Sequence, residues 1–123
     1  MDRLNEIMER LLAEDGCPWD RAQTHESLRP YILEEAQELA EAIDSGDKNA
    51  LRDELGDVLL QVVFHAKLAQ GAGDFDFSDV VQGLCNKLVR RHSHIFGENK
   101  AESVEDVIRL WQETKKKEKT EFA

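Results

Sequence analysis

The sequence predicts an all-α protein of four to five helices that form a single domain over residues 1–123. Three observations support this prediction. Apolar residues recur every three or four positions over most of the chain, which is the period of one helix face. Only two prolines interrupt the chain, and runs of β-branched residues are short. Hydrophobic residues make up 41% and charged residues 34%, which suits a helix-rich domain with its own core.

The first helix is expected over about residues 2–13, where apolar residues form one stripe. The stretch Cys17–Asp20 is expected to be a loop, because a helix cannot continue past Pro18. Thr24 or Ser27 is expected to cap the next helix, without a clean capping box.

The second helix is expected over about residues 28–43. At 100° per residue, Glu35 falls inside its apolar arc and Glu38 on the edge, whereas Glu34 lies further round and Glu41 opposite. A carboxylate inside an apolar stripe is costly unless it is paired or binds a metal. Two interpretations of Glu35 stay open at this point: a salt bridge to an arginine, or a metal ligand.

The third helix is expected over about residues 49–69, with Glu54 flanking its apolar surface and Asp57 next to it. The short connection Ser45–Asp47 favours antiparallel packing of the second and third helices. The apolar surface is wide, which predicts burial against a partner chain as well as against the core. We therefore expect a homo-oligomer. The surface consists of Leu51, Leu55, Val58, Leu59, Val62, Val63 and Ala66.

Two pairs of acids are spaced three residues apart, Glu35 with Glu38 and Glu54 with Asp57. Residues at this spacing lie one above the other on a helix, so antiparallel packing would bring all four carboxylates together. Such a cluster repels itself unless a cation lies in it. Hard divalent cations such as Mg²⁺ prefer oxygen ligands and fit this need.

The fourth helix is expected from Ser78, as its N-cap, to about His92. Arg91 lies within the apolar stripe of this helix and Lys87 on its border, whereas Arg90 points away. Lys87 and Arg91 are therefore expected to face the acidic site or a substrate. A structural ion pair with the acids is the alternative.

The last helix is expected to start after Ser103, with Trp111 on its apolar side and Lys115 one turn further on. From about residue 115 to 123, lysine and glutamate dominate. This stretch is expected to be a solvated, partly frayed polar tail.

Several classes of function are disfavoured. The net charge of −10 argues against general nucleic-acid binding, because it repels phosphate. No apolar run reaches the length of a membrane span, and Cys17 and Cys85 are expected to be reduced thiols in a cytoplasmic protein. His92 and His94 could suggest zinc, but no second ligand pair has the usual spacing.

The acid motif resembles that of the MazG family, within the all-α NTP pyrophosphatase superfamily. That motif is EExxE followed by ExxD, here Glu34-Glu35-x-x-Glu38 and Glu54-x-x-Asp57. Many members carry proline where Ser93 stands, a difference in a loop. The resemblance covers about Leu4 to Lys115, with one such domain. Further matching blocks are Cys17-Pro18-Trp19-Asp20, Gln23-Thr24-His25, Ser27-Leu28-Arg29-Pro30 and Lys87 to Gly97.

The resemblance implies hydrolysis of a nucleoside triphosphate to the monophosphate and pyrophosphate, as house-cleaning of the nucleotide pool. It also implies a bundle of the all-α NTP pyrophosphatase type, as a homodimer or homotetramer. Its implied metal is Mg²⁺, or Mn²⁺, on Glu35, Glu38, Glu54 and Asp57, with Glu34 accepting a proton from water or binding a further ion. Lys87 and Arg91 would neutralise the triphosphate, while Trp111 would stack on the base and Lys115 would meet phosphate.

Other functions remain possible from the sequence. The superfamily includes dUTPases and a phosphoribosyl-ATP pyrophosphohydrolase, but the CPWD and KLVRRH blocks favour MazG. An inactive nucleotide-binding regulator is disfavoured because all five acids are present. A purely structural dimerisation module is disfavoured because it would place leucine where these acids stand.

Overall fold

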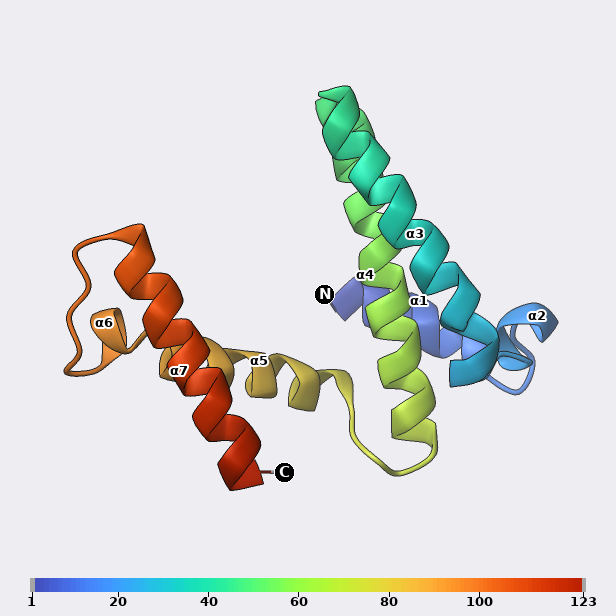
Figure 1. Ribbon diagram of the computed structural model, residues 1–123. Helices are drawn as coiled ribbons and strands as arrows, with labels where there is room; N and C mark the ends of the chain where they lie inside the picture. Colours follow the sequence, from blue (N-terminus) through green and yellow to red (C-terminus); the bar gives the residue numbers. More distant parts are fainter. Residues whose placement is uncertain (1, 123) are drawn as a thin grey trace. The chain divides into compact units, whose positions relative to one another are not determined.

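The computed structural model describes the backbone of residues 2–122 and the side chains as far as residue 119. This part of the chain contains seven helices and no strand, so the predicted all-α class is confirmed (Figure 1). The chain divides into two compact units, Met1–Phe77 and Ser78–Ala123, and each is described by itself. The single domain expected from the sequence stays a prediction. The helices are α1 (Asp2–Leu12), α2 (Pro18–Arg21), α3 (His25–Ser45), α4 (Lys48–Gly71), α5 (Phe77–Arg91), α6 (Ser93–Phe96) and α7 (Val104–Phe122).

Two of these helices, α2 and α6, are single turns that the sequence did not predict. The stretch Cys17–Asp20 was expected to be a loop, but Pro18 instead opens α2 at the first helical position. Proline is tolerated there because the first N–H groups of a helix have no partner within it. Proline therefore marks a helix start here and not only a helix end.

The start of α3 also differs from the prediction. A capping box is present: Thr24 Oγ1 accepts from the Ser27 backbone N–H at 3.0 Å, and Ser27 Oγ accepts from the Thr24 N–H at 2.8 Å. The prediction that no clean capping box exists was wrong, because serine here fills the place usually taken by glutamate or glutamine. The helix accordingly begins at His25, before the expected start at Leu28.

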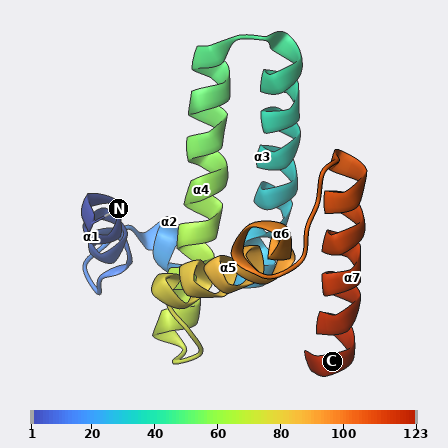
Figure 2. The same ribbon diagram turned by 90° about the vertical axis from the view of Figure 1, so that its left-hand side faces the viewer.

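The connection between α3 and α4 is only Gly46 and Asp47. Gly46 has a φ of 72°, in the left-handed region that glycine adopts without steric cost. Asp47 then caps α4 by accepting from the backbone N–H of Asn49 at 2.9 Å. This tight connection lays α3 and α4 side by side and antiparallel, as Figure 2 shows.

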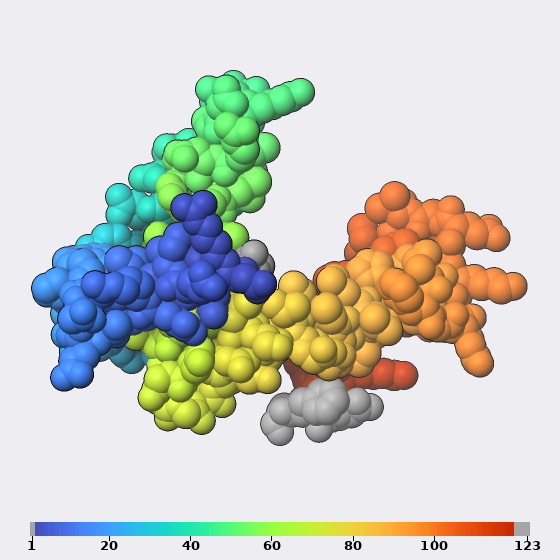
Figure 3. All heavy atoms as spheres, turned by 180° about the vertical axis from the view of Figure 1, so that it is seen from behind, coloured from blue at the N-terminus to red at the C-terminus, as the bar shows by residue number. Residues whose placement is uncertain are grey.

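The core of the first unit lies where α1, α3 and α4 meet. Met8, Leu28, Val63 and Phe64 are almost fully buried there. In the space-filling view, α1 (blue) lies on the surface of α4 (green) (Figure 3). Burial of apolar side chains at this end holds the pair of long helices in register, and their acids lie further along it. The residues packed around the core are Leu4, Leu11, Leu12, Leu68 and Phe77.

The second unit contains α5, α6 and α7. Its last helix begins as predicted: Ser103 caps α7, its hydroxyl accepting from the Asp106 backbone N–H at 3.1 Å. The predicted cap of α5 was wrong, because the helix begins at Phe77 and Ser78 lies inside it. The polar stretch from residue 115 also differs from the expected frayed tail, because α7 continues to Phe122. The part of that stretch from residue 120 onward lies outside the described side chains.

Candidate metal site and basic pocket

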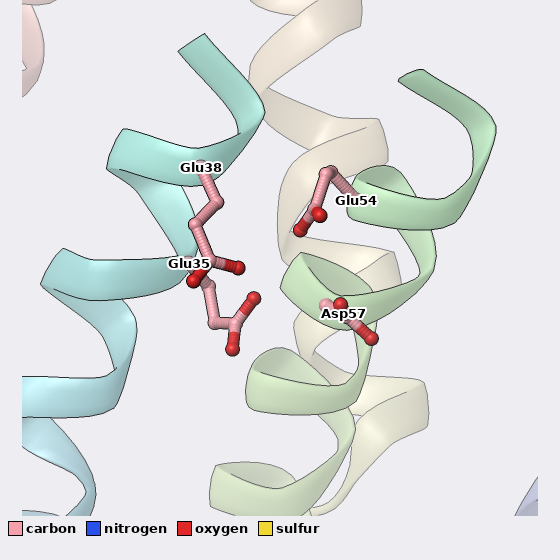
Figure 4. A group of neighbouring side chains, drawn as sticks. All are labelled: Glu35, Glu38, Glu54 and Asp57. Atoms are coloured by element: carbon pink, nitrogen blue, oxygen red, sulfur yellow. The ribbon is translucent and has the colours of Figure 1, made fainter. Parts of the chain in front are cut away.

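Four carboxylates gather between α3 and α4. Figure 4 shows Glu35 and Glu38 reaching from α3 toward Glu54 and Asp57 on α4. One oxygen from each residue lies within 4.8 Å of the others. Over the described side chains this is the one group of three or more acids, histidines or cysteines that could hold a metal ion. The spacing of three residues on each helix produces it, because both members of a pair face the same neighbour.

None of the ion pairs among the described side chains compensates the negative charge of this cluster. Burial, followed by the charge of Glu38, raises the pKa of Glu54 to about 7. The same causes, in the same order, raise the pKa of Glu35. The Oε2 atoms of Glu35 and Glu54 are buried and have no hydrogen-bond partner in the described part of the chain. Buried oxygens without partners are costly, so the site favours a ligand that supplies positive charge.

The donor set fits a hard divalent cation. All four gathered side chains are carboxylates, which suit Mg²⁺, Ca²⁺ or Mn²⁺ more than a soft metal. Glu35 could instead have paired with an arginine, but none of the ion pairs among the described side chains involves Glu35. The salt-bridge interpretation of Glu35 thus has no partner among the described side chains, and its role as a metal ligand stays a prediction.

Two further acids on α3 lie outside this cluster. Glu34 is exposed, and its charge is the weakest contribution to the raised pKa of Glu35. Glu41 is exposed as well, and its carboxylate accepts from Gln37 Nε2 at 3.3 Å. The structure thus separates the four gathered acids from Glu34, for which a different role has to be tested.

The second unit contains a basic pocket of about 580 Å³ between α5 and α7. Three of the predicted substrate-binding residues, Lys87, Arg91 and Lys115, line it together. We use the name basic pocket for this cavity. Arg90, Glu118 and Lys119 contribute to its wall as well. A cavity with this excess of cations suits a phosphate-bearing ligand.

Trp111 lies close to this pocket but does not line it. Its ring is half-buried, with the Arg91 guanidinium carbon 5.2 Å from the ring centroid. The His92 ring meets its edge, at 5.1 Å between centroids. One side of Trp111 lines a smaller groove of about 260 Å³ with Val107, Ile108 and Gln112. A flat ligand stacked on Trp111 would lie in that groove.

The sequence analysis placed two residues of the basic pocket wrongly. Arg90 was expected to point away, yet it lines the pocket beside Arg91. Glu118 was assigned to the solvated tail, yet its side chain is only 13% exposed and binds both arginines. One face of a helix carries Trp111, Lys115 and Glu118, because they are spaced four and three residues apart. This spacing is the signal that could have revealed Glu118.

A pair of histidines in the first unit was also missed. His25 at the start of α3 and His65 on α4 have stacked rings, with their Nδ1 atoms 2.7 Å apart. Burial and then the charge of His25 lower the pKa of His65. His92 and His94, considered for zinc, have ring centroids 5.5 Å apart and join no cluster of three ligands among the described side chains.

Comparisons with known proteins point in one direction. Residues 23–96 match the model of the MazG nucleotide pyrophosphohydrolase domain. The chain also resembles the crystal structure of a mazG-related protein from Thermotoga maritima. The TM-score is 0.75 at 33% identity, covering 94% of this chain and 99% of that one.

Two curated relatives are similar over almost the whole chain. One is the nucleoside triphosphate pyrophosphohydrolase/pyrophosphatase MazG of Thermotoga maritima, 49% identical over 118 residues, covering 96% of this chain and 45% of the relative. The other is the nucleoside triphosphate pyrophosphohydrolase of Escherichia coli strain K12, 46% identical over 124 residues, covering 100% of this chain and 47% of the relative. The chain therefore spans about half the length of these relatives.

Proposed function

The chain belongs to the MazG nucleotide pyrophosphohydrolase family, and from this premise we propose that it hydrolyses nucleoside triphosphates between the α- and β-phosphates. Water adds to the α-phosphorus, the bond to the bridging oxygen breaks, and the products are a nucleoside monophosphate and pyrophosphate. The observation that carries this proposal is the acidic cluster, in which two buried oxygens have no hydrogen-bond partner among the described residues. Substrate and cluster are both anionic, so the cluster would need a bound cation before it could accept the substrate.

Glu35, Glu38, Glu54 and Asp57 are the proposed ligands of Mg²⁺, with Mn²⁺ as the alternative. A divalent cation at this site supplies positive charge for the phosphate oxygens and makes water a stronger acid. The carboxylates fix where that charge lies, because they come from two helices joined by a tight turn. Glu34 is exposed and adjacent, so we assign it either proton transfer from water or a further ion.

Lys87, Arg91 and Lys115 are proposed to bind the phosphates, because they line one cationic cavity. As the bond breaks, negative charge grows on the leaving pyrophosphate, and fixed cations stabilise that charge. Trp111 is proposed to stack on the base through the side of the ring that faces its groove. The role in the cell that fits these residues is removal of unwanted nucleotides from the pool.

We propose a homodimer or homotetramer in solution. On α4, Leu55 is 50% exposed and Val62 41%, and on α3 Leu33 is 59% exposed. Large apolar side chains in such number along two neighbouring helices favour burial against a second copy. Sedimentation at micromolar concentration tests this, since a monomer alone would contradict the proposal.

A cytoplasmic location is proposed because Cys17 and Cys85 are free thiols. Among the described residues, no helix combines the length and the apolar character that a membrane span requires.

The test of the activity is a panel of nucleoside triphosphates assayed for pyrophosphate release with and without Mg²⁺. Release of pyrophosphate that depends on the metal supports the proposal. Release of inorganic phosphate with a diphosphate as the second product would show the wrong bond breaking. The dUTPase-like and phosphoribosyl-ATP alternatives predict activity on dUTP alone or on phosphoribosyl-ATP alone. The inactive-regulator alternative predicts binding without turnover.

A further inference from the structure

Among the described side chains that line the basic pocket, Glu118 is the one carboxylate, and two arginines share it. Glu118 Oε1 accepts from Arg90 Nε at 3.1 Å, and Arg90 Nη2 lies 3.0 Å from the same oxygen. Glu118 Oε2 accepts from Arg91 Nη2 at 2.9 Å. Each oxygen therefore binds a different guanidinium. Because the Glu118 side chain is 13% exposed and that of Arg91 18%, water screens the Arg91 pair only weakly.

Arg90 and Arg91 are neighbours in sequence near the end of α5, so their side chains leave the helix about 100° apart. Nothing in the geometry of α5 alone would send two such side chains to one place. The carboxylate of Glu118, presented by α7, bonds to both and brings both to the wall of one pocket. The contact that gathers them is therefore a tertiary one.

Arg91 is fixed on two sides and still has a free donor. Glu118 binds its Nη2, and its guanidinium lies against the Trp111 ring. Its Nε is buried and has no hydrogen-bond partner among the residues that the structure describes. A guanidinium presents several donors in a rigid fork, so a group held at one nitrogen can still donate to a phosphate from another. The bond to Arg91 also keeps the pKa of Glu118 below its usual range, so the carboxylate stays charged at neutral pH.

We propose that Glu118 is a positioning residue, which holds Arg90 and Arg91 together on the wall of the basic pocket so that both meet the triphosphate. This inference rests on the proposed function, because the triphosphate is the anion that the pocket would receive. It also adds Arg90 to the residues that bind substrate. Glu118 acts through the arginines and does not itself touch the substrate.

The direction in which Glu118→Gln changes the affinity for polyphosphate separates a positioning role from an effect of charge alone. Glu118→Gln keeps the size of the side chain and removes its negative charge, so the pocket becomes more positive. If charge alone mattered, polyphosphate would then bind more tightly. If Glu118 positions the arginines, binding of polyphosphate becomes weaker. The carboxamide has one oxygen that can accept from one guanidinium, and it presents an N–H₂ group, which cannot accept, to the other.

The experiment uses the full chain and inorganic tripolyphosphate as the probe, with calorimetry in the absence of metal. For Glu118→Gln we expect about tenfold weaker binding, the scale of one lost charge-assisted contact. Glu118→Asp keeps the charge but is one methylene shorter, and should fall between the variant and the wild type. Glu113→Gln is the matched control, since it removes the same charge from an exposed site on α7 outside the pocket. Unchanged or tighter binding by Glu118→Gln would overturn the proposal, and so would a wild type that does not bind tripolyphosphate.

A double-mutant cycle tests the mechanism of the effect. If Glu118 acts through Arg90, Arg90→Ala should weaken binding in the wild type and have little further effect in Glu118→Gln. Fully additive effects would contradict the proposal. In turnover assays, Glu118→Gln should raise KM more than it lowers kcat, a split that a general loss of folded protein does not produce. A wild type that binds tripolyphosphate but hydrolyses no nucleoside triphosphate would refute the proposed function, while the comparison of variants would still decide the role of Glu118.

Discussion

The acidic cluster of the first unit and the basic pocket of the second differ in whether neighbouring side chains balance their charges. Among the described side chains, no ion pair includes these four acids, and two of their buried oxygens have no hydrogen-bond partner. The arginines of the pocket share the carboxylate of Glu118. The pKa values follow this difference, because burial raises that of Glu54 whereas the arginines lower that of Glu118.

The difference indicates what each site needs from outside. A cluster of like charges is costly to fold and gains most from a cation, so its ligand is part of its stability. A pocket whose cations are already ordered by an internal acid gains mainly in affinity for an anion. We therefore expect changes in the cluster to alter catalysis and stability strongly, and changes in the pocket to alter mainly the binding of substrate.

The largest effect is expected at Glu38. Glu38→Gln removes one anionic ligand at constant size and should lower turnover by about 100-fold or more, since positioning and charge supply most of phosphoryl-transfer catalysis. Glu41→Gln is the control, because Glu41 is exposed on the same helix outside the cluster. Turnover and melting temperature across a Mg²⁺ titration measure both variants. Loss of activity in Glu41→Gln with activity retained in Glu38→Gln would mean that other acids build the site.

The next effect concerns stability and metal. Mg²⁺ at 100 times its Kd should stabilise the folded protein by about 2.7 kcal/mol, the value for a ligand that binds only the folded state. Glu54→Gln should melt at a higher temperature than the wild type in chelator, because one repulsion is removed, and should respond less to Mg²⁺. Thermal melts in matched ionic strength measure this. If the melting temperature of the wild type does not change with Mg²⁺ or Mn²⁺, the claim that the acidic cluster gains stability from a cation is wrong.

A smaller effect is expected from pH in the absence of metal. The pKa of Glu54 is about 7 in the folded state against 4.5 as the ordinary value, so the folded protein binds this proton more tightly. Its stability should therefore rise as pH falls from about 8 to about 6, the opposite of a carboxylate in a salt bridge. Denaturant unfolding in chelator at several pH values measures the slope of the free energy of unfolding against pH. The histidines contribute equally in the wild type and in Glu54→Gln, so the difference between the two slopes reports Glu54. Equal slopes in both proteins would contradict the raised pKa of Glu54.

The smallest effect is expected at Lys115, one of the residues that line the basic pocket. Lys115→Gln should raise KM for the nucleotide about fivefold, which corresponds to roughly 1 kcal/mol of lost binding, with little change in kcat. Lys117→Gln is the control, because Lys117 is exposed on the same helix and does not line the pocket. The difference should shrink at high salt, where exposed charges are screened. A large loss of kcat in Lys115→Gln would place this lysine at the reacting phosphate instead.

Local spacing explains what could be predicted. The period of a helix fixes the relative direction of Glu35 and Glu38, and of Glu54 and Asp57, so the sequence was sufficient to expect these acids to face one another. The all-α class followed from the same periodicity. The catalytic and binding roles of these residues stay predictions.

Long side chains and distant partners explain what could not be predicted. Arg90 bonds to Glu118, which lies 28 positions further along the chain. The pairing of His25 with His65 spans 40 positions, and no sequence pattern marked it. Both depend on tertiary contacts that bring distant segments together, whereas helix periodicity describes only neighbours along one element.

The two-residue connection at Gly46 and Asp47 has a consequence for the order of folding events. It makes the antiparallel contacts of α3 and α4 local in sequence, and contacts of that kind form early and quickly. The four carboxylates would then approach one another before the rest of the chain has organised. Their repulsion would act on the transition state for folding, so divalent cations should increase the refolding rate and not only slow unfolding.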